Sequence, residues 1–244
     1  MQLGTWIVTP HPSIVELMAN HRFDWLCIDL EHSPVSRQEL QIALAIIQGK
    51  GKKAFVRVPL NSHLEIKYPL DAGADGIIIP MVNSAAEARE AVQHCLYPPK
   101  GKRGVGLSRA QGYGFGFEGH LKKNLKDLTI IVQIEHINAV NEIEAILDVE
   151  GVAGVFLGPF DLSGSLGIPG QFDHPSMVAA IKKVADATLK TKKFLGAHVI
   201  APDHRTVKSY AEKGYNFIAF SLDTLFLGQK IRDELAALGR PSDL

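Results

Sequence analysis

Residues 24–30 read DWLCIDL, a short run that is apolar almost throughout and is followed directly by a glutamate and a histidine. Seven further runs of this kind recur along the chain: GTWIV, KAFVRVP, GIIIPMV, TIIVQIE, GVFLG, LGAHVI and FIAFS. Near-continuous apolar runs of this length are typical of parallel strands that are covered on both faces. The sequence therefore predicts eight buried strands.

Longer amphipathic stretches separate these runs, among them SRQELQIALAIIQ, SAAEAREAVQHCL, INAVNEIEAILD and DHRTVKSYAEKG. Ser84 and Asp203 stand where N-caps are expected, and Gly214 stands where a helix should end. Eight strand–helix units in 244 residues predict an α/β fold, a single (β/α)8 TIM barrel spanning residues 1–244. A doubly wound open sheet is the alternative. It is less favoured because no dinucleotide-binding glycine fingerprint follows the first run.

The composition excludes several classes of protein. Hydrophobic residues make up 46% and charged residues 21%, which is typical of a globular chain. Lysine plus arginine equals aspartate plus glutamate at 26 each, so the basic excess of a nucleic-acid binder is missing. No apolar run approaches the ~18 residues of a membrane span. We expect a cytoplasmic location, because the start MQLGTWIV does not resemble a secretory signal and there are only two cysteines.

Active sites of (β/α)8 barrels lie at the C-terminal ends of the strands, so polar residues at those ends are informative. Asp29 stands three residues before His32, a spacing that suits a carboxylate orienting a general acid/base. Arg57 ends the third run among apolar neighbours, where burial is costly unless the guanidinium meets an anion. That anion is either a structural partner such as Asp71 or Asp75, or a substrate carboxylate or enolate oxygen.

Carboxylates end the fifth and sixth runs. Alternation along a strand puts Gln133 and Glu135 on one face, pointing into the barrel mouth. The sixth run passes through Gly158 to Asp161, so Glu135 and Asp161 lie at adjacent strand ends. Hard divalent cations take one or two protein carboxylates together with water and substrate oxygens. The arrangement suits the polarisation of a 2-oxo acid and the stabilisation of its enolate.

Other segments are less informative. Residues 97–119 form a long glycine-rich stretch that is either functional or a flexible connection, and it should carry a short helix before the fifth strand. No lysine lies in the interior of a predicted strand, as a Schiff-base aldolase requires. The turns after the last two runs lack the glycines of a phosphate-binding barrel. His198, inside the seventh run, either reaches the barrel mouth or packs in the interior, and packing is favoured.

The combination of FDWLCIDLEHSP, VRVP, YPPKGKRGVG, VQIE and GVAGVFLGPFDLSGSLG is specific, and the matching segments span about residues 4–230. The chain resembles the class II (metal-dependent) pyruvate aldolases of the 4-hydroxy-2-oxoheptanedioate aldolase and 2-dehydro-3-deoxyglucarate aldolase family. The resemblance implies a (β/α)8 lyase that reversibly cleaves a 4-hydroxy-2-oxo acid to pyruvate and an aldehyde through a metal-stabilised enolate. It also implies a homo-oligomer, expected to be a hexamer, in which the last helix is exchanged between subunits.

The resemblance further implies a role for each site residue. Glu135 and Asp161 would hold Mg²⁺, Mn²⁺ or Co²⁺, and Arg57 would steady the enolate. His32, oriented by Asp29, would handle the proton of the C4 hydroxyl, with support from Asp71 of this or a neighbouring subunit. Gln133 would line the site. The substrate carboxylate would bind at the segment formed by Gly158, Pro159, Phe160 and Asp161.

Two alternatives stay open at this point. One is an acyl-CoA lyase of the citrate lyase or malyl-CoA lyase branch of the same superfamily. The other is a catalytically silent barrel that serves as a binding module, although the intact set of polar strand-end residues argues against it. The stretch after RGVG departs from the family's pattern, so the resemblance does not indicate which aldehyde is used. The expected partners are small molecules, a 2-oxo acid and an aldehyde.

Overall fold

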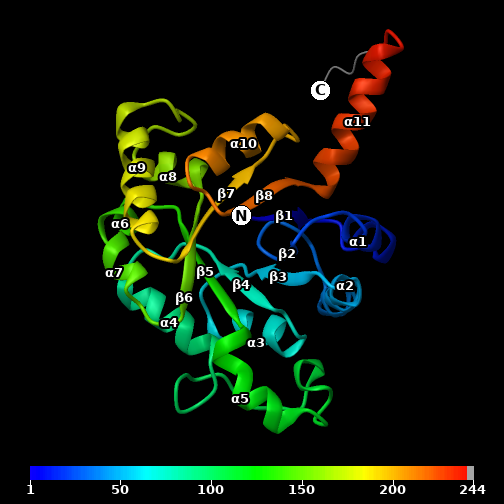
Figure 1. Cartoon of the computed structure of the whole chain (residues 1–244), viewed down its shortest axis with the longest axis vertical. Coiled ribbons are helices and arrows are strands. Elements are labelled where there is room, and N and C mark those ends of the chain that lie inside the picture. Colours follow the sequence, from blue (N-terminus) through cyan, green and yellow to red (C-terminus); the bar gives the residue numbers. More distant parts are fainter. Residues whose placement is uncertain (241–244) are drawn as a thin grey trace.

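The computed structural model describes residues 1–240, and within 122–126 it describes the backbone alone. Eight parallel strands close into a barrel in the order β1-β2-β3-β4-β5-β6-β7-β8 (Figure 1). The predicted (β/α)8 barrel is confirmed, and the open-sheet alternative is wrong. The expected single domain over 1–244 includes residues 241–244, which lie outside the described residues, and it stays a prediction. The strands are β1 (Gln2–Ile7), β2 (Trp25–Asp29), β3 (Lys53–Arg57), β4 (Gly76–Ile79), β5 (Thr129–Ile134), β6 (Val152–Leu157), β7 (Phe194–Val199) and β8 (Phe217–Leu222).

Helices surround the barrel and begin where the sequence indicated. Ser84 caps α4 through the amide of Glu87, and Asp203 caps α10 through the amide of Arg205. Gly214, with φ of 89°, follows the end of α10. The helices are α1 (Pro12–Ala19), α2 (Arg37–Gly49), α3 (His63–Asp71), α4 (Ala85–Cys95), η1 (Arg109–Gln111), α5 (Phe117–Asp127), α6 (Ile137–Asn141), α7 (Ile143–Leu147), α8 (Pro159–Ser165), α9 (Pro175–Leu189), α10 (His204–Glu212) and α11 (Asp223–Ala237).

The stretch 137–148 forms two short helices, α6 and α7, rather than one. Glu142 lies at the break and its carboxylate accepts a hydrogen bond from the amide of Ala85, 3.0 Å away, at the start of α4. Glu142, between α6 and α7, thus helps to cap the start of α4. The glycine-rich stretch 97–119 carries η1 and the start of α5 before β5, as expected.

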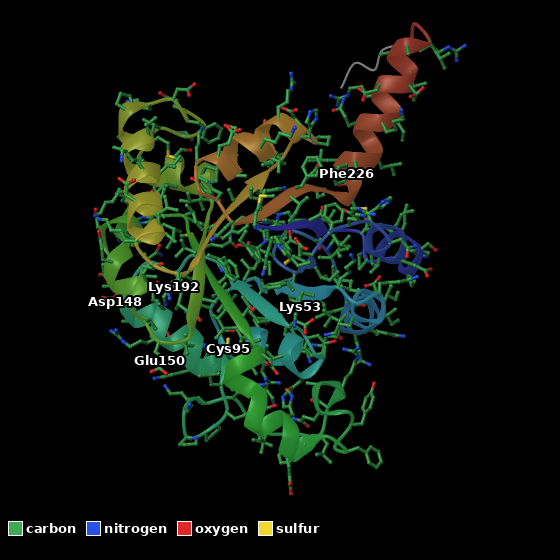
Figure 2. The ribbon with its side chains drawn as sticks, viewed as in Figure 1. Lys53, Cys95, Asp148, Glu150, Lys192 and Phe226 are labelled. Carbon is green, nitrogen blue, oxygen red and sulfur yellow. The ribbon has the colours of Figure 1, made fainter. Side chains whose placement is uncertain are left out.

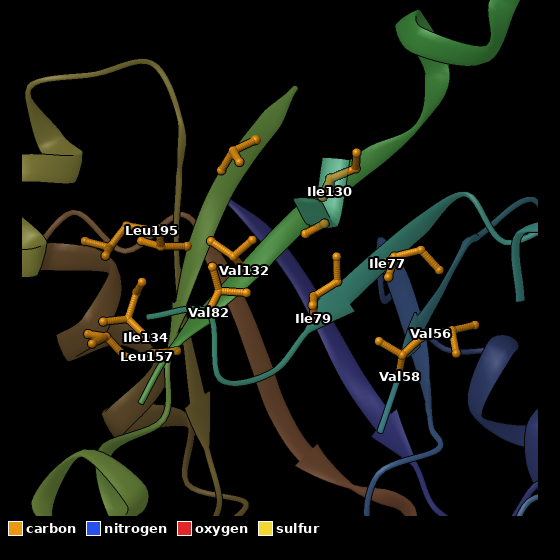
Figure 3. Close-up of a cluster of buried hydrophobic side chains, with 14 of the residues drawn as sticks. Val56, Val58, Ile77, Ile79, Val82, Ile130, Val132, Ile134, Leu157 and Leu195 are labelled. Carbon is orange, nitrogen blue, oxygen red and sulfur yellow. The ribbon is translucent and has the colours of Figure 1, made fainter. Parts of the chain in front are cut away.

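The core has two layers. Between strands and helices lies an aliphatic layer that includes Val56, Ile77, Ile79 and Val132 (Figure 3). Inside the barrel lies a second, aromatic cluster. Its members are Trp6, Trp25, Cys27, Phe55, Ile78, Ile131, Phe156, Phe217 and Ala219. We call this cluster the aromatic floor, because the polar residues of the barrel mouth stand directly above it.

Strand alternation produces the change from floor to mouth. On β2 the inward series is Trp25, Cys27 and then Asp29, and on β3 Arg57 follows Phe55. Asp29 and Arg57 are direct neighbours across the β2–β3 ladder. Two residues beyond the aromatic layer, the interior therefore becomes charged.

The last helix, α11, stands away from the barrel (Figure 1). Phe226 lies at the barrel end of this helix (Figure 2). Its ring packs edge-to-face on Phe220, with the ring centroids 5.2 Å apart. Farther along, Leu227 and Ile231 are 60% and 51% exposed. At its base, residues of α1, β8 and α11 line an apolar groove of about 630 Å³. Within the described residues, no helix is long and apolar enough to cross a lipid bilayer.

We predict that Gly4→Ala destabilises the protein strongly, because a Cβ at this position overlaps the indole of Trp25, which is stacked on Phe217 at 4.3 Å. The expected loss of unfolding free energy is about 1–3 kcal/mol, the usual scale of an overpacked core. Gly49→Ala is the matched control, since nothing lies near its Cβ and helix propensity favours alanine. Urea denaturation of both variants measures the difference; an unchanged midpoint for Gly4→Ala would contradict a rigid floor.

Candidate active site

Arg57 is the central charge of the barrel mouth. Its Nε donates to Oδ1 of Asp29 at 2.9 Å and its Nη2 donates to Oδ2 at 2.7 Å, a bidentate pair. Its Nη1 lies 3.2 Å from Oε2 of Glu31. The guanidinium also covers the ring of Trp6, with Cζ 4.6 Å from the ring centroid. The structural ion pair considered above is thus formed with Asp29 and Glu31, and not with Asp71 or Asp75.

His32 lies at the rim, with a side chain that is 68% exposed. Its Nε2 lies 3.7 Å from Oε2 of Glu31. Asp29 was expected to orient this imidazole, but its carboxylate instead accepts from Arg57 and from the amides of Glu31 and His32. A buried carboxylate is stabilised more by a buried cation and by amides than by an exposed ring. Asp29 thus positions the loop that carries His32, while Glu31 is the carboxylate nearest the imidazole.

Glu135 and Gln133 lie on one face of the chain, as predicted. The amide Nε2 of Gln133 donates to Oε1 of Glu135 at 2.9 Å, and the main-chain N–H of Met81 donates to Oε2 at 3.0 Å. Burial is the main reason that the pKa of Glu135 is raised from 4.5 to about 7. The charges of Glu31 and Asp161 raise this pKa further. Gly158 lies against the same carboxyl group, because a Cβ there would overlap it.

Asp161 lies in the first turn of α8 and is exposed to solvent. Its charge acts on both Glu31 and Glu135, so three carboxylates face one another across the mouth. Pro159 begins the helix, and the amides of Phe160 and Asp161 stand in its first turn, where no intrahelical acceptor is available. Phe160 itself is exposed. The segment 158–161 thus presents a carboxylate and free amides to the same space.

This donor set fits a hard divalent cation. The part of the chain that the structure describes holds no ready cluster of three or more His, Cys, Asp or Glu side chains in metal-binding range. Such a cation needs only one or two protein carboxylates and keeps several waters. Glu135 is buried and its charged form is disfavoured without a cation. Oε1 of Gln133 is buried and has no hydrogen-bond partner among the described residues. Glu135 and Asp161 are the carboxylates that would hold the ion.

Asp71 lies away from these residues. It ends α3, which runs back from the C-terminal end of β3, so it stands toward the opposite end of the barrel. Its Oδ1 accepts a 2.7 Å hydrogen bond from Nη2 of Arg103, which is buried. The structure therefore brings together the predicted residues Asp29, Arg57, Gln133, Glu135, Gly158 and Asp161, with His32 at the rim, and it does not bring Asp71 to them within one chain.

Sequence reasoning missed the contributions of Glu31, Trp6 and Met81, and it favoured packing for His198. Glu31 stands two residues after Asp29, so the same alternation that placed Gln133 and Glu135 together would have found it. Trp6 and His198 occupy inward positions of β1 and β7. Met81 contributes only its backbone, at a left-handed φ of 52°, and no side-chain pattern announces that role.

Comparisons with known proteins identify the family of this chain. Residues 2–228 match the family described as HpcH/HpaI aldolase/citrate lyase. The chain is 38% identical to a hydroxypyruvate/pyruvate aldolase of Sagittula stellata, covering 93% of this chain and 88% of that protein. It is 36% identical to a 4-hydroxy-2-oxo-heptane-1,7-dioate aldolase of Escherichia coli, covering 98% and 90%. A crystal structure of a protein of the same family from Burkholderia cenocepacia superposes with a TM-score of 0.91 at 32% identity, covering 97% and 94%.

Glu135 makes the stability of the chelated protein depend on pH. The pKa of Glu135 is higher in the folded state than in the unfolded state. Its contribution to the free energy of unfolding is therefore fully present below pH 4.5 and is lost as pH rises through about 7. The expected loss is about 3 kcal/mol between these limits. In Glu135→Gln this component should be absent, so the Tm difference between variant and wild type should shift in favour of the variant as pH rises. Parallel pH profiles of Tm in the presence of chelator would contradict the assignment.

Proposed function

Because the chain belongs to the HpcH/HpaI aldolase/citrate lyase family, we propose that the mouth of this barrel reversibly cleaves a 4-hydroxy-2-oxo acid to pyruvate and an aldehyde. As an aldolase the chain is a carbon–carbon lyase. The observation that carries the proposal is the convergence of Arg57 with the buried carboxylate of Glu135 above a closed aromatic floor. This places a fixed cation beside the pair of carboxylates that would hold a metal.

The chain's own residues account for the steps. The free amides of Phe160 and Asp161 bind the carboxylate of the 2-oxo acid. A base at the rim, His32 directly or through water, removes the proton of the C4 hydroxyl. The C3–C4 bond then breaks, its electron pair forms the enolate of pyruvate, and the aldehyde leaves. The enolate takes up one proton at C3 to give pyruvate, which balances the proton removed from the hydroxyl group. Arg57 stabilises the negative charge on the C2 oxygen. A divalent ion such as Mg²⁺, Mn²⁺ or Co²⁺ held by Glu135 and Asp161 would supply Lewis-acid polarisation of the 2-oxo acid.

The alternatives have less support. The relatives that match nearly the whole chain at 36–38% identity are named as aldolases that act on free acids. No feature of the mouth that is described above favours an acyl-CoA substrate. The buried, hydrogen-bonded Arg57 and Glu135 argue against a catalytically silent barrel, because burying such groups costs free energy that simple packing would not need. We also propose a reducing, cytoplasmic setting, because Cys27 and Cys95 are both free and buried.

We further propose that the protein is a homo-oligomer in which α11 packs on a second copy. The helix presents Leu227, Ile231 and Leu235 to solvent, whereas its base borders the apolar groove beside α1. An exposed apolar stripe and a nearby apolar groove on the same chain are complementary, so reciprocal exchange would bury both. A neighbouring subunit is also the only source from which Asp71 would reach His32. A hexamer is the expected assembly.

The exchange predicts a change in mass. Leu227→Glu combined with Ile231→Glu places two charges in the buried contact, so the oligomer should dissociate to smaller species, with little change in the far-UV circular dichroism of the barrel. Lys230→Glu, on the same helix at a position 72% exposed, is the matched control. Light scattering coupled to size exclusion measures the masses. If the double variant keeps the wild-type mass, α11 does not carry the interface.

The activity is tested with Arg57→Lys. Wild-type protein with Mg²⁺ or Mn²⁺ should exchange the methyl protons of pyruvate into D₂O and add pyruvate to aldehydes, and chelation should abolish both reactions. Lysine keeps the charge but not the planar fork, so both rates should fall roughly 10²–10³-fold. The unfolding free energy should fall by about 2 kcal/mol, because lysine loses one of the two charge-assisted hydrogen bonds to Asp29. Arg205→Lys, in an exposed pair with Asp203, is the control. Normal exchange by a stable Arg57→Lys protein would remove Arg57 from the mechanism.

A further inference from the structure

His198 faces the same space as Arg57, although the aldolase steps do not use it. On β7 the neighbours Ala197 and Val199 belong to the outer aliphatic layer, so His198 points into the barrel. Its ring packs edge-to-face against Trp6, with centroids 5.9 Å apart. Trp6 is the ring that Arg57 covers. The imidazole and the guanidinium thus share one neighbour, and His198 is half-buried rather than sealed.

The orientation of the imidazole is set by β8. Its Nε2 lies 3.3 Å from the carbonyl oxygen of Ser221. Ser221 has a left-handed φ of 52° at a point where the β8–β1 register shifts, and Oγ1 of Thr5 donates to the same carbonyl. A carbonyl only accepts hydrogen bonds, so the proton of the neutral ring resides on Nε2. Nδ1 therefore keeps its lone pair, and no described residue donates to it.

The ring stays neutral under physiological conditions. Burial lowers the pKa of His198 from 6.5 to about 4. The hydrogen bond with the Ser221 carbonyl opposes this shift, the positive charge of Arg57 lowers the pKa further, and Asp29 has a weaker raising effect. A base this weak is unsuited to removing protons from carbon or from a hydroxyl group at neutral pH. A neutral acceptor set in an apolar wall formed by Trp6 is, however, suited to recognising a hydroxyl group.

We propose that Nδ1 of His198 accepts a hydrogen bond from a hydroxyl group of the substrate and so makes the enzyme prefer hydroxylated substrates. The hydroxyl group lies either on C3 of the 2-oxo acid or on the carbon next to the aldehyde. This inference rests on the proposed aldolase function and names a substrate class for that site. A site that hydrogen-bonds a hydroxyl group discriminates against the analogue that lacks it, because its polar atom is then left unpaired.

The test is a two-by-two set of reactions with Mg²⁺ present. The nucleophile is pyruvate or hydroxypyruvate, and the acceptor is acetaldehyde or glycolaldehyde. We expect wild-type protein to prefer the hydroxylated member of one pair. His198→Leu should reduce that preference in kcat/KM by about 10-fold or more. The reaction of pyruvate with acetaldehyde should change far less. The pair that responds identifies the position of the hydroxyl group.

Two further variants make the result decisive. His198→Asn places an amide oxygen near the position of Nδ1 and should restore part of the preference, and it replaces the leucine variant if that protein does not fold. His94→Leu, the same change at a buried histidine of α4, should leave the preference unchanged. Equal losses in all four reactions, or an unchanged preference in His198→Leu, would overturn the assignment. Absence of all four reactions with wild-type protein would instead refute the proposed function on which it rests.

Discussion

The bidentate pair between Arg57 and Asp29 is the interaction on which the mouth of the barrel depends. It joins β2 to β3 one step above the aromatic floor, where the interior changes from apolar to charged. Neither charge is tolerable there alone, because an unpaired buried ion costs several kcal/mol. Within this pair, the carboxylate of Asp29 also accepts hydrogen bonds from the amides of Glu31 and His32. Nη1 of Arg57 remains available and pairs with the carboxylate of Glu31. One ion pair thus fixes the positions of the rim loop, the guanidinium of Arg57 and the carboxylate of Glu31.

The sequence was sufficient for features that depend on periodicity. Near-continuous apolar runs predicted the eight strands, and alternation placed Gln133 and Glu135 together, because strand geometry has a period of two wherever it occurs. It was insufficient where groups compete for a partner. Asp29 was expected to bind the ring of His32, yet Arg57 and two amides are stronger partners, and that competition depends on burial that a spacing does not reveal. The partner of Glu142 at the break between α6 and α7 is equally hidden from local sequence, since its carboxylate accepts from the amide of Ala85, 57 residues away.

Two residues reach the site through strained backbone rather than through side chains. Met81 and Ser221 both have a φ of 52° near strand ends, where L-residues are uncommon. Met81 directs an N–H to Glu135, and Ser221 directs a carbonyl to His198. Conformations of this kind cost of order 1–3 kcal/mol and persist where surrounding structure over-determines them. Here the closed barrel holds both backbones in place. Each of the two residues then provides one hydrogen-bonding partner for a side chain of the mouth, Glu135 or His198.

The aromatic floor also has a consequence for the order of events. Trp25 and Phe217 are fully buried and stacked at 4.3 Å, so the aromatic floor closes the barrel interior beneath the polar residues of the mouth. Under the proposed function, a 2-oxo acid held beside Arg57 and Glu135 would have this floor directly beneath it, so the aldehyde would stand above it, on the side of the rim. That arrangement would favour a binding order in which the 2-oxo acid enters first in synthesis and the aldehyde leaves first in cleavage. The floor would thus favour a kinetic order in a reaction whose chemistry alone demands none.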